Sequence, residues 1–147
     1  LQATIVGAGN DLAALQQKTE ALGLQSVVRF MGSLPPAKVA QLMQQHEWLL
    51  VPSWEEPFGT VVPEALACGC KVIHAAAGGL PEAGGNCAWA VSSNKPVDYS
   101  TLIIHDWQQP AQATEAENAE IAAHLQQLTV AHTAAALLQN IQDAITR

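Results

Sequence analysis

The chain has 147 residues, of which 49% are hydrophobic and 13% charged, and its formal net charge is −7. This length suffices for one domain whose hydrophobic core needs neither disulfides nor metals. The acidic balance argues against a nucleic-acid-binding protein, which would present a basic face, and against docking on an anionic membrane through charge.

The three cysteines, Cys68, Cys70 and Cys87, are an odd number without the spacing of a disulfide framework or of a metal site. The sequence shows neither a signal peptide nor an apolar run long enough to span a bilayer. We therefore expect free thiols and a cytoplasmic protein. Because the chain starts at Leu1 with a strand-like run and not with Met, we expect it to be a fragment.

The first third of the chain alternates between short apolar runs and helical patterns. Strands are predicted at residues 3–6, 27–31 and 48–51, with a helix after each of the first two. Asp11 can cap the first helix and Gly23 can end it. The run Trp48-Leu49-Leu50-Val51 is apolar throughout, as is typical of a strand covered on both faces.

The next segment begins with Pro52 to Gly59, which is too rich in Pro, Ser and Gly for regular structure. A helix is predicted from Thr60 to Cys68, because Pro63 is tolerated in a first turn and a glycine follows the last residue. A strand at residues 71–75, a loop at 78–82 and a short strand at 88–91 complete the pattern. This βαβα order predicts an α/β fold with a doubly wound, mostly parallel, Rossmann-like sheet.

The remainder of the chain has a different pattern. Residues 92–110 are predicted to be irregular, and residues 111–147 to form C-terminal helices. Ile121, Leu125 and Leu128 form one apolar stripe, and a second stripe runs from Val130 to Ile145. The predicted organisation is a single domain over residues 1–147, with a βαβ core in residues 1–91.

Three loops, at residues 7–10, 52–60 and 75–82, should lie beyond the carboxyl ends of the strands, where open parallel sheets bind ligands. In the middle loop, Glu56 precedes a helix start and Glu64 lies just inside the helix. A helix start offers unbonded N–H groups to a phosphate, and a carboxylate can accept from two neighbouring hydroxyls. A phosphate site between two carboxylates matches a nucleotide sugar.

These loops carry a family resemblance. Pro52-Ser53-x-x-Glu56-x-Phe58-Gly59, then Glu64-Ala65-x-Ala67-x-Gly69-x-x-Val72-Ile73, then Gly78-Gly79-x-x-Glu82, resemble the signature of glycosyltransferase family 4. Ile5-Val6-Gly7-x-Gly9 and Val28-x-Phe30-x-Gly32 are similar to the second and third strands of the same family. The resemblance covers residues 3–91 and implies the C-terminal, nucleotide-sugar-binding half of a retaining enzyme with the GT-B fold.

The resemblance also implies roles for single residues. Glu56 would be the catalytic residue, contacting donor-sugar hydroxyls near the anomeric carbon, and Glu64 would hold the ribose. The implied donor-binding set is Glu64, Phe58, Gly59, Thr60, Val61, Met31 and Gly7, although Gly7 also reads as a simple turn glycine. Such enzymes usually need no metal and no cofactor, because helix ends and basic side chains stabilise the departing nucleoside diphosphate.

The family's Arg and Lys for the diphosphate follow a strand that would precede Leu1 and would be central in the sheet. The implied partners are a nucleotide-sugar donor and a sugar or lipid acceptor held by a missing N-terminal domain. Membrane contact is expected only through parts outside this sequence, and no nucleic acid is expected.

Other interpretations remain open on the sequence alone. Glu56 and Glu64 also fit solvated carboxylates near a helix start. Trp54 fits either a stacking platform or a loop anchor, and His74 fits a satisfied or an exposed histidine. At the level of function, the alternatives are a non-catalytic binding module and another GT-B-type enzyme, such as a phosphorylase or a nucleotide-sugar epimerase.

Overall fold

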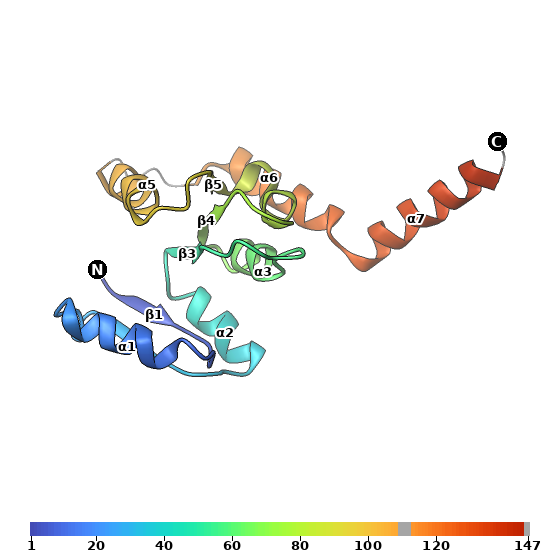
Figure 1. Ribbon diagram of the computed structural model, residues 1–147. Helices are drawn as coiled ribbons and strands as arrows, with labels where there is room; N and C mark the ends of the chain where they lie inside the picture. Colours follow the sequence, from blue (N-terminus) through green and yellow to red (C-terminus); the bar gives the residue numbers. More distant parts are fainter. Residues whose placement is uncertain (109–112, 146–147) are drawn as a thin grey trace. The chain divides into compact units, whose positions relative to one another are not determined.

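The computed structural model describes residues 1–108 and 113–145, and only the backbone of residues 140–141 and 143–145. The remaining positions of the predicted C-terminal helical region, residues 111–112 and 146–147, lie outside the described residues. Contacts divide the chain into two compact units, residues 1–42 and 43–147 (Figure 1). The single-domain organisation stays a prediction for the whole protein.

The first unit is a βαβα segment. It contains β1 (Ala3–Ile5), α1 (Leu12–Ala21), β2 (Val28–Phe30) and most of α2 (Pro36–Met43). The strands pair in parallel, so a helical crossover must connect them. Gly23 ends α1 with a left-handed φ of +67°, as predicted. Asp11 occupies the N-cap position, but its side chain makes no capping hydrogen bond, contrary to the prediction.

The second unit is built on a three-stranded parallel sheet with the order β3-β4-β5. Its strands and connecting helices are β3 (Trp48–Val51), α3 (Val61–Ala67), β4 (Lys71–Ala75), α4 (Leu80–Gly84), the 3₁₀ turn η1 (Gly85–Cys87), β5 (Trp89–Val91) and α5 (Pro96–Gln108). β4 lies between the other two strands and is buried from Val72 onward. All strand pairs among the described residues are parallel, which confirms the predicted α/β fold with a mostly parallel sheet.

The strands form two sheets and not one continuous sheet. In the part of the chain that the structure describes, β1 pairs with β2 alone and β3 pairs with β4 alone. Each of these two strands therefore keeps one unpaired edge of N–H and C=O groups. The central strand that the resemblance places before Leu1 stays a prediction.

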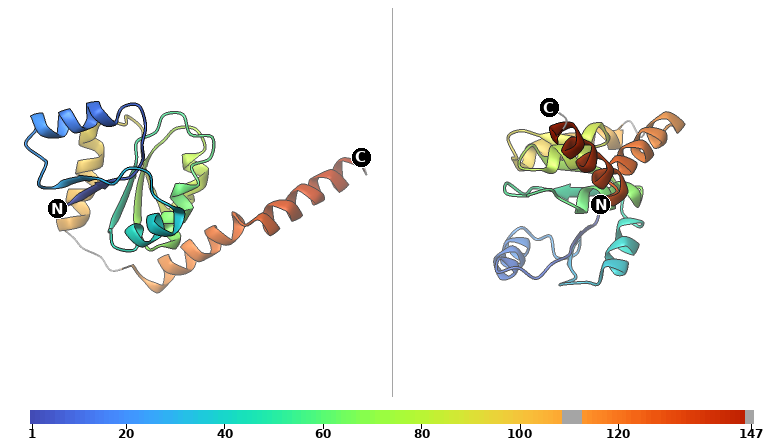
Figure 2. Two further views of the ribbon diagram at one scale, coloured as in Figure 1. Left: turned by 90° about the horizontal axis from the view of Figure 1, so that it is seen from below. Right: turned by 90° about the vertical axis from the view of Figure 1, so that its right-hand side faces the viewer.

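Helices cover both faces of the three-stranded sheet. Successive side chains of a strand point to opposite faces. Ile73 belongs to a core cluster with Val91 of β5 and Tyr99 of α5. The ring of the next residue, His74, lies against Gly84 of α4. These two helices consequently lie on opposite sides of the sheet, as Figure 2 shows.

Two predictions in this unit were wrong. The segment 78–82, predicted to be a loop, contains the start of α4, with Pro81 in its first turn. Residues 92–110, predicted to be irregular, contain α5. Pro96 occupies its first position, where no N–H is needed, and the Asp98 carboxylate accepts hydrogen bonds from the Ser93 hydroxyl and the Lys95 N–H. Leu102 and Ile103 pack against the core cluster, whereas the next residue, Ile104, is 48% exposed.

The amino ends of the strands are tied to the end of α5. The Lys71 ammonium lies 2.6 and 2.8 Å from the two carboxylate oxygens of Asp106, and 5.4 Å from the ring centroid of Trp48. Trp48 in turn contacts Trp89, with ring centroids 5.1 Å apart. This cluster lies at the amino ends of the strands, whereas the predicted ligand site lies at their carboxyl ends.

Two further helices follow, α6 (Glu115–Gln127) and α7 (Val130–Ile145). In α6 the predicted apolar stripe is half-buried and the helix contacts α3 and η1. In α7 the predicted stripe is exposed: Val130 is 86% exposed and Leu137 58%. The side chains of Ile141 and Ile145 lie outside the described residues. None of the described helices has the length and apolar character needed to cross a membrane.

Candidate functional site

Three loops of the second unit lie at the carboxyl edge of its sheet. They are residues 52–60 between β3 and α3, residues 76–79 between β4 and α4, and residues 92–95 between β5 and α5. Parallel strands place these loops on one side by construction. The first loop and the start of α3 carry six of the eight residues that the sequence predicts for a donor site.

The first two loops interlock through their backbones. The Gly79 N–H donates to the Glu56 carbonyl at 2.8 Å. A Cβ atom on Gly78 would lie 2.2 Å from the Glu56 carbonyl oxygen, and one on Gly79 would lie 2.3 Å from the Pro57 carbonyl oxygen. Both distances are far inside van der Waals contact, so only glycine allows this approach.

Gly59 is a third glycine at the contact between the two loops. Its φ of +81° is left-handed, and a Cβ atom there would lie 2.4 Å from Leu80 Cδ2 and 3.2 Å from Glu56 Cγ. The Glu56 side chain therefore lies close to Gly59 at its Cγ, and the residue is half-buried. Glu56 is thus held at its own carbonyl, and its Cγ lies beside the Gly59 backbone.

The start of α3 offers backbone donors next to Glu56. Thr60 is the N-cap, but its helical φ and ψ of −51° and −25° leave its side chain without a capping hydrogen bond. Val62 N–H donates to the Gly59 carbonyl and Pro63 has no N–H. Among the described residues, no acceptor meets the N–H groups of Thr60 and Val61. Because α3 has only seven residues, these donors matter more than its macrodipole.

Glu64 and Phe58 flank these donors. Glu64 is exposed and lies one helical turn after Thr60, to whose carbonyl its N–H donates at 3.2 Å. Phe58 is half-buried. The structure thus brings six of the predicted residues into one short stretch, from Glu56 to Glu64, with the acids on either side of the helix start.

Gly7 and Met31 belong to the first unit and form a separate group. Gly7 has a φ of +140° and donates its N–H to Gly32, while Met31 donates to Ile5 and is 45% exposed. Nothing lies within 4 Å of a Cβ atom built on Gly7, so its backbone conformation alone explains the glycine. This favours the turn-glycine interpretation.

Sequence reasoning missed Asn94, which lies in the third loop. It has a φ of +48°, and among the described residues it is the only non-glycine with a positive φ. Its amide joins two elements: Nδ2 donates to the Pro52 carbonyl at 2.9 Å, and Oδ1 accepts from the Tyr99 hydroxyl. The turn signal Ser92-Ser93-Asn94-Lys95-Pro96 could have identified this position, because Asn tolerates left-handed backbone.

Two residues with open interpretations are now placed. Trp54 is 61% exposed, which argues against a loop anchor. His74 is 1% exposed, and its Nδ1 lies 2.8 Å from the Ala75 carbonyl oxygen, so it is a satisfied core histidine.

Cys70 and Cys87 show no sign of catalytic activation. Cys70 is buried and donates to the carbonyls of Met43 and His46. Burial raises its pKa, and the neighbouring Cys68 adds to the effect, so the reactive thiolate is disfavoured. Burial likewise raises the pKa of Cys87, with a contribution from Glu120. In the part of the chain that the structure describes, no three His, Cys, Asp or Glu side chains form a group that could hold a metal ion.

Among curated relatives, the D-inositol 3-phosphate glycosyltransferase of Corynebacterium jeikeium (strain K411) is 38% identical over 97 residues, which cover 65% of this chain and 23% of the relative. The enzyme of the same name from Rhodococcus opacus (strain B4) is 32% identical over 151 residues, which cover 98% of this chain and 34% of the relative. The chain thus spans about a quarter to a third of these relatives.

Solved structures agree on the architecture. HepE of Anabaena, crystallised with UDP-glucose, matches 99% of this chain and 40% of its own, with a TM-score of 0.68 and 25% identity. Sucrose-phosphate synthase from Thermosynechococcus elongatus matches 97% of this chain and 39% of its own, with a TM-score of 0.75 and 24% identity, and so bears on the fold alone. The fold is that of GT-B glycosyltransferases. Residues 1–123 match the family described as "Glycosyl transferases group 1", and the chain belongs to this family.

Proposed function

We propose that this chain is the donor half of a retaining, family 4 hexosyltransferase that takes a nucleoside-diphosphate sugar without a metal. The observation that carries the proposal is the interlocked pair of loops, which fixes Glu56 beside the donors of Thr60 and Val61. Backbone N–H groups suit the distal phosphate, and carboxylates suit the hydroxyls on either side of it. That HepE was crystallised with UDP-glucose makes this the first donor to test.

In this proposal Glu56 contacts the sugar near the anomeric carbon, and Glu64 holds the ribose. The backbone of Gly59, Thr60 and Val61 binds the distal phosphate. Glu56, whose backbone carbonyl is fixed by Gly79, is suited to a demanding geometry, whereas the exposed Glu64 on a helix is suited to binding. The acceptor, a sugar or lipid, would bind to a part of the protein outside this sequence, in cytoplasmic polysaccharide or lipopolysaccharide synthesis.

The test uses the natural full-length protein with UDP-, GDP- and ADP-sugars. D-inositol 3-phosphate is a first acceptor, after the relatives' names. Glu64→Ala should raise the donor KM about 10-fold or more, the effect of losing a charge-assisted hydrogen bond. Glu56→Gln should lower kcat on the order of 100-fold. Glu55→Gln is the matched control, because Glu55 is an adjacent, exposed acid. The proposal fails if no nucleotide sugar binds, or if Glu64→Ala leaves the donor KM unchanged.

One observation favours a second candidate, a binding module without turnover. The described loops at the carboxyl edge of the second unit carry Glu55 and Glu56 against a single base, Lys95. Stabilising a departing diphosphate needs positive charge that these loops do not supply in excess. Donor binding without any transfer by the full-length protein would select this candidate.

A further inference from the structure

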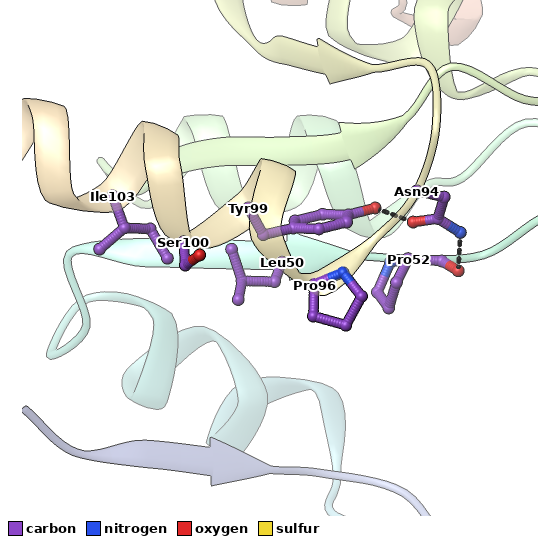
Figure 3. Close-up of a pocket in the computed structure, with 7 residues that line it drawn as sticks. All are labelled: Leu50, Pro52, Asn94, Pro96, Tyr99, Ser100 and Ile103. Carbon is purple, nitrogen blue, oxygen red and sulfur yellow. Dashed lines mark hydrogen bonds between the residues drawn. The ribbon is translucent and has the colours of Figure 1, made fainter.

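We propose that Asn94 is a positioning residue, which fixes the loop carrying Glu56 by holding the carbonyl of Pro52. The inference rests on the proposed function for its catalytic consequence, but the tether itself is a property of the fold. Figure 3 shows Asn94 between Tyr99 on α5 and Pro52 at the end of β3. Pro52 is the first residue of the loop, four positions before Glu56.

The backbone conformation of Asn94 limits which residues fit at this position. A left-handed φ of +48° is unfavourable for most L-residues, and glycine would adopt it without strain. Asn, in contrast, tolerates this conformation and brings an amide with both a donor and an acceptor. Both groups are used, the donor on Pro52 and the acceptor on Tyr99.

The hydrogen bond from Asn94 to Pro52 lies beside a pocket. A pocket of about 370 Å³ opens beside Pro52. The lining residues are Leu50, Pro52, Asn94, Pro96, Tyr99, Ser100 and Ile103. Pro52 is exposed, and the hydrogen bond from Asn94 is the polar contact that holds its carbonyl beside this pocket. The far end of the loop is fixed separately, at the Glu56 carbonyl and at Gly59.

The Tyr99 hydroxyl bonds to the other end of the Asn94 amide, its acceptor oxygen. Tyr99 is only 7% exposed, so its ring is fixed in the core and its hydroxyl reaches Asn94 from a fixed direction. Burial, and then the nearby Asp98, raise the pKa of Tyr99 above its ordinary value, at which the hydroxyl is already protonated and able to donate near neutral pH. The two hydrogen bonds use different atoms of Asn94: Oδ1 accepts from Tyr99, and Nδ2 donates to Pro52.

The experiment compares three variants of the natural full-length protein. Asn94→Gly accepts the left-handed backbone but lacks the amide. Asn94→Asp keeps an acceptor for Tyr99 but has no donor for Pro52. Tyr99→Phe removes the Tyr99 hydroxyl and leaves the bond to Pro52, so it is the matched control.

Two measurements are made: hydrogen exchange of residues 53–58, and kcat and KM with a nucleotide-sugar donor. Losing one hydrogen bond should speed exchange in this segment and lower kcat about 5- to 10-fold in both Asn94 variants. The donor KM should change less than about twofold, because Glu64 lies on α3 and keeps its place. Tyr99→Phe should stay within about twofold of the wild type in both measurements.

Wild-type exchange in Asn94→Asp would overturn the inference, as would equal loosening in Tyr99→Phe. A uniform rise in exchange throughout the second unit would also overturn it, because it would indicate general destabilisation. If the wild type turns over no nucleotide sugar, the proposed function fails instead, and the exchange measurement still decides on the tether.

Discussion

Gly79→Ala tests the interlocked loops most directly. Gly79 has an ordinary φ of −85°, so alanine meets no backbone penalty there. Its Cβ, however, would lie 2.3 Å from the Pro57 carbonyl oxygen and 2.6 Å from Phe58 Cα. To restore an ordinary contact of 3.4 Å, the loop must move by about 1 Å (3.4 − 2.3). Forcing backbone apart by this much should reduce the free energy of unfolding by about 2–3 kcal/mol.

The matched control is Gly69→Ala in the same unit. Gly69 has a φ of +87°, and nothing lies within 4 Å of its Cβ position. This variant should therefore show the left-handed backbone cost alone, about 1 kcal/mol. Urea unfolding followed by tryptophan fluorescence suits the comparison, because all four tryptophans of this chain lie in the second unit. A Gly79→Ala cost no larger than that of Gly69→Ala would refute the close approach of the two loops.

Three further predictions concern stability and reactivity. A double-mutant cycle with Lys71→Met and Asp106→Asn should give a coupling energy of about 1 kcal/mol that decreases with salt, and no coupling would contradict the ion pair. Thr114→Ala should lower helix stability by about 1 kcal/mol, measured as faster hydrogen exchange at the start of α6. Because hydrogen bonds from the Thr114 backbone and then its side chain lower the pKa of Glu117, this protection should be complete above the ordinary carboxyl pKa. It should be lost as the pH falls through the lowered pKa, and pH-independent protection would contradict the cap. Cys70 should react with iodoacetamide at pH 8 at least about tenfold more slowly in the folded protein than in urea, as mass spectrometry would show; equal rates would contradict its burial.

The sequence predicted those parts of the fold whose signals are local. β3 and β4 have the predicted bounds, because each is a short apolar run between strong turn residues. α3 begins and ends within a residue of its prediction, because Pro63 fits only a first turn and Gly69 only a stop.

The missed features depend on contacts between distant segments. Gly78 and Gly79 match a motif, but their reason lies in the backbone of another loop, which no local pattern reveals. α5 was missed because Pro96 and the preceding serines suggest a loop, whereas its helical face is defined by the core on which it packs. The roles of Glu56 and Glu64 stay predictions, since the structure gives their positions and not their ligands.

The contact between the two loops also has a consequence for motion. Since the backbones of residues 56–58 and 78–79 meet without intervening side chains, neither loop can swing open as an independent lid. The second of these loops leads directly into α4. There the Ala83 carbonyl lies 2.9 Å from His124 Nε2, and the ring of His124 covers Gly85. We therefore expect a ligand that binds Glu56 to slow backbone fluctuations from the two loops to α6, because the contacts described above connect these segments.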